Sequence, residues 1–103
     1  MNAIVQEKVK DLPALCNHRG VRRLALFGSA ASGLFNPTSS DLDFLVEFHL
    51  VGPAQHADNY FGLQDDLERL FGVPVELVEP GPIHNPYFQQ AVEKTQVLLY
   101  AAA

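Results

Sequence analysis

Apolar and polar residues follow two periods along the chain, which predict helices and strands in turn. Near the start, apolar residues recur three or four positions apart, the spacing of one helical face: Val5, Val9, Leu12, Leu15 and Cys16. Pro13 interrupts this face, and a proline inside a helix removes a hydrogen bond and clashes with the preceding turn. We therefore expect one broken helix, with Asp11 capping the turn after the break and Cys16 in the core.

Two extended segments come next. Residues 21–27 (VRRLALF) end in a continuous apolar run that predicts a buried strand stopping at Gly28. In residues 41–48 (DLDFLVEF), apolar residues at even positions alternate with acidic residues at 41, 43 and 47, the period of a half-buried strand. Residues 29–34 predict a short helix, and residues 36–40 a turn. One face of the second strand is therefore expected to be acidic.

The second half of the chain continues the alternation. After a loop at Gly52 and Pro53, apolar residues at 60, 63, 67, 70 and 71 predict an amphipathic helix that stops at Gly72. Residues 73–78 (VPVELV) predict a third strand, and Asn85 followed by Pro86 predicts another helix start. The tail at 97–100 fits either a last short strand or a helix end.

The order of these elements is typical of an α/β (α+β) protein with a small mixed sheet of three to four strands covered by helices. A length of 103 residues fits one domain spanning residues 1–103. The chain is 48% hydrophobic and 18% charged, which argues for a folded globule rather than disorder. At this size the core is thin, so a deep pocket is expected to need a partner.

Charge, cysteine content and hydropathy exclude several classes of protein. Seven Lys and Arg against twelve Asp and Glu give a net charge of -5, the wrong sign for bulk nucleic-acid binding. The single cysteine cannot form an internal disulfide, and no Cys/His spacing resembles a zinc site. No apolar run approaches a membrane span of roughly 18 residues, and the N-terminus lacks a signal-peptide layout. We expect a cytoplasmic protein with no membrane association.

Candidate chemistry is concentrated at Gly28 and Ser29 and in the acidic strand that follows. Asp41 and Asp43 project to one face of that strand, with Cα atoms about 6.5 to 7 Å apart. Hard divalent cations such as Mg²⁺ take carboxylate oxygens and stabilise a reacting phosphoryl group. Gly28 permits close backbone approach, and Ser29 offers a hydroxyl and amide groups to phosphate at a helix start. The pattern predicts a metal site beside a triphosphate site.

Glu76 is the predicted third ligand, because it interrupts an otherwise apolar strand. A charge there needs a partner or an exit to water. It is also the best-placed base to take a proton from an acceptor hydroxyl. The plainer alternatives are a solvated acidic strand face and, for Ser29, a simple helix cap. Glu47 is interpreted as an exposed strand residue rather than a ligand.

These residues resemble the minimal nucleotidyltransferases (MNT) of the polymerase-β superfamily. The sequence signature of this family is Gly-Ser at the end of one strand, Asp-x-Asp on the next strand and a further carboxylate on a third strand. The resemblance covers most of the chain, in the segments LALFGSAASG, SSDLDFLVEF, GLQDDLERLFGVPVELVEP and NPYFQQAVEKTQVLLYAA. Family members of this size resemble the antitoxin of a pair whose toxin is a helical HEPN ribonuclease.

The resemblance implies an activity and a set of site residues. Mg²⁺ and ATP would be used, with attack on the α-phosphate, loss of pyrophosphate and transfer of AMP to a tyrosine hydroxyl of the toxin. Asp41, Asp43 and Glu76 would be the catalytic metal ligands. Gly28 and Ser29 would bind the nucleotide phosphates.

One departure from the family pattern supports a second hypothesis. Ser32 stands where members often have an arginine, so a cation near the phosphates is missing. The alternative is a catalytically weak or inactive antitoxin that neutralises its toxin by binding and occlusion. A third hypothesis is transfer to a small-molecule hydroxyl, although relatives of that kind usually carry an extra domain. The sequence leaves open the acceptor, the base preference, the number of groups transferred and the oligomeric state, a homo-oligomer included.

Overall fold

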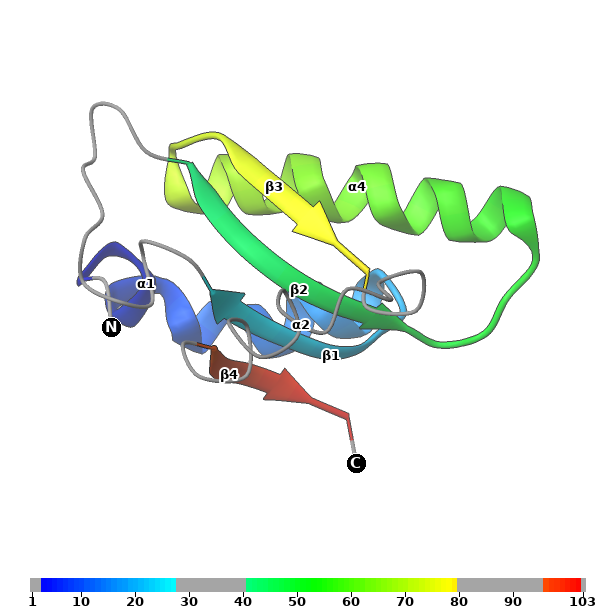
Figure 1. The fold of residues 1–103 in the computed structure, drawn as a ribbon, viewed down its shortest axis with the longest axis horizontal. Coiled ribbons are helices and arrows are strands. Elements are labelled where there is room, and N and C mark those ends of the chain that lie inside the picture. The colour runs from blue at the N-terminus through cyan, green and yellow to red at the C-terminus, as the bar shows by residue number, and fades with distance from the viewer. Residues whose placement is uncertain (1–2, 28–40, 80–95, 103) are drawn as a thin grey trace, which may run out of the picture.

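The structure is a computed structural model that describes residues 3–27, 41–79 and 96–102. Its four-stranded sheet has the order β3-β2-β1-β4 (Figure 1). The strands are β1 (Val21–Phe27), β2 (Leu42–Phe48), β3 (Val75–Val78) and β4 (Val97–Ala101). β1 pairs antiparallel with β2 and β4, whereas β2 and β3 are parallel. The predicted mixed sheet is confirmed, and the tail forms a strand.

Parallel strands need a crossover connection, and helix α4 (Pro53–Phe71) provides it between β2 and β3. Pro53, expected in a loop, is instead in the first turn of the helix, where its fixed φ is favourable and its missing N–H is not needed. The third strand begins at Val75, two residues later than predicted. Pro74 lies just before it and accepts a hydrogen bond from the Leu42 N–H at 3.0 Å.

The broken N-terminal helix is confirmed, but its expected cap is wrong. Helix α1 (Ala3–Lys8), the 3-10 turn η1 (Val9–Asp11) and helix α2 (Leu12–His18) follow one another. Pro13 lies in the first turn of α2, a position that tolerates proline. Asp11 occupies the N-cap position without a side-chain capping bond, because its backbone is helical (φ -88°, ψ -11°) and not extended as capping requires.

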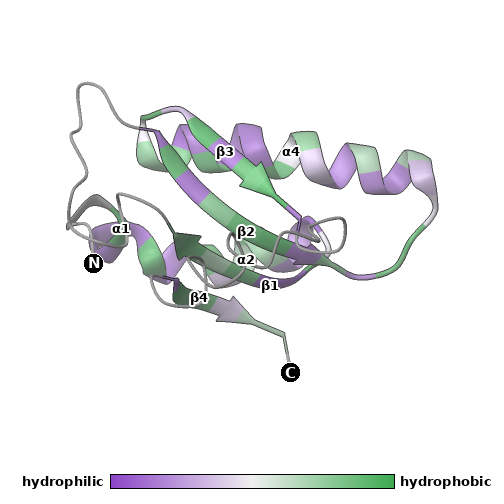
Figure 2. Cartoon of the chain, viewed as in Figure 1, coloured by the Kyte–Doolittle hydropathy of each residue, from purple (hydrophilic) through white to green (hydrophobic). Residues whose placement is uncertain are grey.

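The hydrophobic core lies between one face of the sheet and the helices. Hydropathy alternates along the strands in Figure 2, and the even-numbered residues 42, 44 and 46 of β2 are fully buried. The core also contains residues of the other elements: Val5, Leu12, Cys16, Leu24, Leu26, Leu63, Leu67, Phe71, Val75 and Leu77. Phe44 stacks on Phe71 with ring centroids 5.8 Å apart. Cys16 is a core residue as predicted, and burial raises the pKa of its thiol to about 12.

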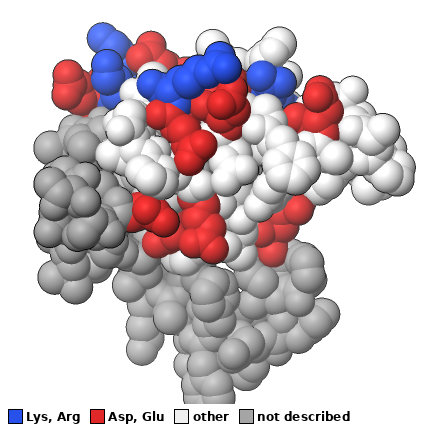
Figure 3. Space-filling view, turned by 90° about the horizontal axis from the view of Figure 1, so that it is seen from above, with Lys and Arg blue, Asp and Glu red and all other residues white. Residues whose placement is uncertain are grey.

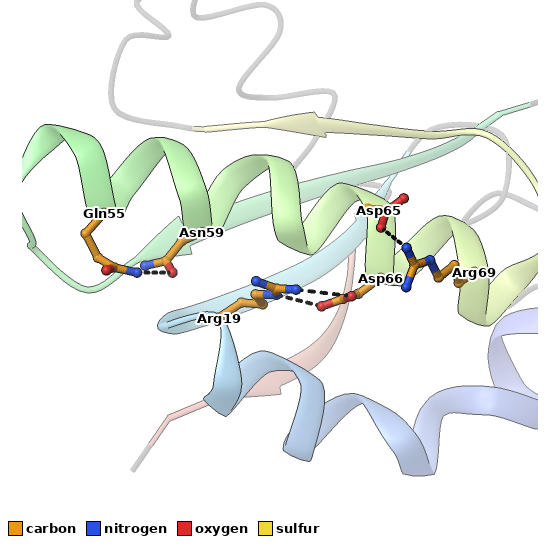
Figure 4. A network of polar contacts seen from close by, with 6 residues as sticks. All are labelled: Arg19, Gln55, Asn59, Asp65, Asp66 and Arg69. Atoms are coloured by element: carbon orange, nitrogen blue, oxygen red, sulfur yellow. Dashed lines mark hydrogen bonds and ion pairs between the residues drawn. The ribbon is translucent and has the colours of Figure 1, made fainter.

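A polar contact fixes the end of α2 to α4 (Figure 4). The Arg19 Nε lies 2.6 Å from Asp66 Oδ2, and this hydrogen bond raises the pKa of the guanidinium. Gly62 of α4 leaves room for the guanidinium, since a Cβ there would collide with Arg19. Close by, Gln55 donates a 2.9 Å hydrogen bond to the buried Asn59 side chain.

In the described part of the chain, no helix is both long and apolar enough to span a membrane.

Two glycines are expected to differ in how they tolerate alanine. Gly20 and Gly72 have φ angles of 67° and 71°, a conformation that costs an L-residue about 1–2 kcal/mol. Gly72→Ala meets no atom within 4 Å, so we expect only that loss in the free energy of unfolding. Gly20→Ala should lose more, because its Cβ would lie 3.0 Å from the buried Asn59 Nδ2. Urea unfolding compares the two variants, and equal losses would contradict a role for Asn59.

Candidate active site

The structure brings the predicted carboxylates of two separate strands together. Asp43 of β2 and Glu76 of β3 are directly paired in the parallel register, and adjacent strands lie about 4.8 Å apart. Their neighbours in sequence point into the core, so Asp43 and Glu76 project from the opposite face of the sheet. Asp41 precedes β2 by one residue and is exposed. Strand alternation places it on the same side as Asp43.

The three carboxylates interact electrostatically. Asp43 is half-buried, and its pKa is raised to about 6. Burial is the largest cause, followed by the charge of Glu76, a hydrogen bond with Glu76 and the charge of Asp41. Figure 3 shows several acidic side chains in the middle of the molecule seen from above, with Lys and Arg along one margin. A bound cation at the three carboxylates would relieve their repulsion.

The donor set fits a hard divalent cation, although the side chains are not already gathered around one. Within residues 3–27, 41–79 and 96–102, no three His, Cys, Asp or Glu side chains form a group that could hold a metal ion as placed. All three candidate donors are nonetheless carboxylates, the ligands that Mg²⁺ prefers. Asp43 and Glu76 are register partners and Asp41 is two residues from Asp43, so the backbone places all three donors on neighbouring positions of the sheet.

The predicted phosphate-binding residues Gly28 and Ser29 lie outside the described residues, as do Ser32 and the helices expected at 29–34 and from Asn85. The structure does describe the end of β1, the strand that precedes Gly28 in the sequence. Phe27 is the register partner of Asp43, so the chain leaves β1 beside the carboxylates. The strand that ends just before Gly28 is therefore a direct neighbour of the acidic strand.

Glu47 has a structural partner of its own. Its carboxylate forms an ion pair with the Arg22 guanidinium across β1 and β2. Glu47 is a strand residue as expected, but it is half-buried rather than exposed, because its carboxylate packs against the Arg22 guanidinium.

Sequence reasoning did not single out a set of α4 side chains that contact the outer edge of β3. These are Tyr60, Gln64 and Glu68, which bond to backbone atoms of Val75 and Leu77. Their spacing of four residues is the available sequence signal, but it resembles that of any solvent-facing helical stripe. The atoms they contact belong to the backbone, which no residue pattern reveals.

The raised pKa of Asp43 predicts a pH-dependent stability. The folded protein binds this proton more tightly than the unfolded chain, whose Asp pKa is about 3.9. The contribution is therefore complete below about pH 4 and is lost as the pH rises through about 6. In metal-free buffer, Asp43→Asn should raise Tm by a few degrees at pH 7.5, with the difference vanishing near pH 4. Thermal unfolding followed by circular dichroism checks this, and a pH-independent difference would contradict it.

The nucleotidyltransferase domain family matches residues 7–99, and the chain belongs to this family. Two relatives from Methanocaldococcus jannaschii, provisionally named protein adenylyltransferases, are 36% and 38% identical over 74 residues. Each alignment covers 72% of this chain, with 72% of the first relative and 71% of the second.

Solved structures agree on the fold. A minimal nucleotidyltransferase structure is similar with a TM-score of 0.74 and 28% identity, over 94% of this chain and 95% of that one. A chain of a toxin-antitoxin complex with AMP-PNP has a TM-score of 0.68 at 18% identity, over 91% of this chain and 73% of that one. A chain from the complex of tri-AMPylated Shewanella oneidensis HEPN toxin with its MNT antitoxin has a TM-score of 0.62 at 17% identity, over 94% and 72%. The fold is that of a minimal nucleotidyltransferase.

Proposed function

We propose that this protein is a Mg²⁺-dependent nucleotidyltransferase that transfers AMP from ATP to a tyrosine hydroxyl of a HEPN-type toxin and so acts as its antitoxin. The observation that carries the proposal is the direct pairing of Asp43 with Glu76 beside Asp41, next to the end of β1. Transfer to the α-phosphate needs negative oxygens near a metal and a phosphate site within reach. The three carboxylates would supply the first, and Gly28 and Ser29, which follow β1 in the sequence, would supply the second.

Each site residue has a defined task in this mechanism. Asp41, Asp43 and Glu76 would hold Mg²⁺, which when bound neutralises charge on the reacting phosphate. Gly28 and Ser29 would bind the phosphates and orient the α-phosphorus for in-line attack. Glu76 is exposed and would accept the proton of the acceptor hydroxyl. The hydroxyl oxygen would then bond to the α-phosphorus, and pyrophosphate would leave.

Two findings support a protein acceptor. The Methanocaldococcus jannaschii relatives carry the name protein adenylyltransferase, and structural neighbours include complexes of a HEPN toxin with an MNT antitoxin. The domain is also small, and its described residues are largely used for one thin core. A partner protein would supply both the hydroxyl and the second wall of the site.

Mass spectrometry of a co-expressed HEPN partner tests the proposal. The purified partner, incubated with this protein, ATP and Mg²⁺, should gain the mass of one or more adenylyl groups on tyrosine. Omission of Mg²⁺ by chelation should prevent the gain. A folded protein that binds ATP and the partner but adds no mass would contradict the proposed activity.

Ser32 favours a second candidate function, neutralisation by occlusion. Without the arginine that family members often have, phosphate binding is weaker and inhibition by contact alone becomes the alternative. The double variant Asp41→Asn, Asp43→Asn separates the two, since occlusion predicts full neutralisation of the toxin in a growth assay. Release of the toxin by that variant would show that occlusion is insufficient.

A further inference from the structure

The strand that carries Glu76 lies at the edge of the sheet. β3 is four residues long, and among the strands that the structure describes only β2 lies beside it. Backbone groups of a strand point alternately to its two sides, and the Pro74 carbonyl accepts a hydrogen bond from Leu42 on the β2 side. The groups of Val75 and Leu77 therefore point to the outer edge, where an edge strand has no ladder partner.

Three side chains of α4 bind this outer edge. The Tyr60 hydroxyl donates to the Leu77 carbonyl at 2.9 Å. The Gln64 side-chain amide donates to the Val75 carbonyl at 3.0 Å, and the Glu68 carboxylate accepts from the Val75 N–H, also at 3.0 Å. Each contact is partly buried, and the three residues are four positions apart on one face of the helix. We call this set the edge clamp.

The edge clamp bonds the strand on both sides of Glu76. Both backbone groups of Val75 are satisfied, as is the carbonyl of Leu77, so the two residues flanking Glu76 are attached to a helix. That helix is itself fixed, because Leu63 and Leu67 of α4 are fully buried in the core. Tyr60 stays protonated and able to donate, since burial and the charges of Glu79 and Glu76 raise the pKa of its hydroxyl.

We propose that Tyr60, Gln64 and Glu68 are positioning residues that hold β3 in the register placing Glu76 beside Asp43. The proposal rests on the proposed function for its catalytic consequence, but the positioning is a property of the apoprotein. Without the edge clamp, β3 keeps its bonds to β2 and the core packing of Val75 and Leu77, but it loses the described bonds at its outer edge and frays more readily. Glu76 then spends less time opposite Asp43, and binding of a shared cation weakens.

Glu68 offers a sharp test, because one substitution removes the contact and another keeps it. Glu68→Ala removes the acceptor for the Val75 N–H, whereas Glu68→Gln keeps an amide oxygen in its place. Asp65→Ala is the matched control, since the exposed Asp65 pairs with Arg69 one turn away and not with the described residues of β3 (Figure 4). Mn²⁺ affinity by calorimetry and exchange of the Glu76 amide by NMR are measured on each, with Asp43→Asn as the metal-site reference.

We expect Glu68→Ala to weaken Mn²⁺ binding about 10-fold, the effect typical of groups that orient metal ligands. It should also speed exchange of the Glu76 amide about 10-fold, whereas Glu68→Gln recovers most of both and Asp65→Ala changes neither. In transfer assays kcat should fall while KM for ATP stays the same. Unchanged amide exchange in folded Glu68→Ala overturns the positioning role whatever the metal result. Wild-type protein that binds no Mn²⁺ contradicts the proposed function instead, and amide exchange alone then decides on the edge clamp.

Discussion

Asp43→Asn is expected to reduce nucleotidyl transfer by about 10³-fold or more in kcat/KM, equivalent to about 4 kcal/mol of transition-state stabilisation. The substitution keeps the size of the side chain but removes a negative oxygen where the metal would bind. Asp43 is also the central member of the trio, in register with Glu76 and two residues from Asp41. Transfer of radiolabelled AMP to the partner measures the loss, and residual activity within 10-fold of wild type would contradict a ligand role.

Glu47→Gln is the matched control for this loss. Glu47 lies on the same strand and the same sheet face as Asp43, but its carboxylate is paired with Arg22. Both variants remove one negative charge from β2. Transfer should therefore survive in Glu47→Gln, and equal losses in the two variants would indicate that the charge of the strand face matters rather than a metal site.

Phe44→Ala is expected to cause the largest loss of stability, about 3–5 kcal/mol in the free energy of unfolding. Phe44 is fully buried and stacks on Phe71 of α4, so its removal leaves a cavity between the sheet and the crossover helix. Small domains are stable by only about 5–15 kcal/mol, so this loss would remove a large share of the total stability. Urea unfolding measures the change. Leu98→Ala, at a residue that is 51% exposed, should lose far less, and similar losses at the two sites would contradict this account of the core.

The two substitutions at positions 43 and 44 show why part of the fold and site was predictable from sequence. Strand alternation separates neighbouring residues onto two faces, so one pattern predicted both the buried Phe44 and the outward Asp43. The helical periods were equally clear where several turns of α4 repeat them. The short tail of β4 has too few residues to distinguish a strand from a helix end, and only its pairing with β1 decides.

Other features depend on tertiary contacts that no local pattern contains. Asp11 has the residue type of a cap, but it is the last residue of the 3-10 turn η1, which gives it a helical backbone. The pairing of Asp43 with Glu76 is fixed by how the crossover helix packs, although the residue types alone suggested a shared site. The edge clamp was missed because its partners are backbone atoms, whose direction depends on the register of β3.

Because Cys16 is buried, the reactivity of its thiol measures how often the folded structure opens. The chain contains one cysteine, and in the folded state its thiol is inaccessible to solvent and its pKa of about 12 keeps it protonated. Thiolate-specific reagents therefore react with molecules in which Cys16 has left the core. The fraction of Cys16 that is labelled measures the fraction of opened molecules, and no engineered probe is needed. Mass spectrometry then compares this fraction between the wild type and each variant above in one mixture.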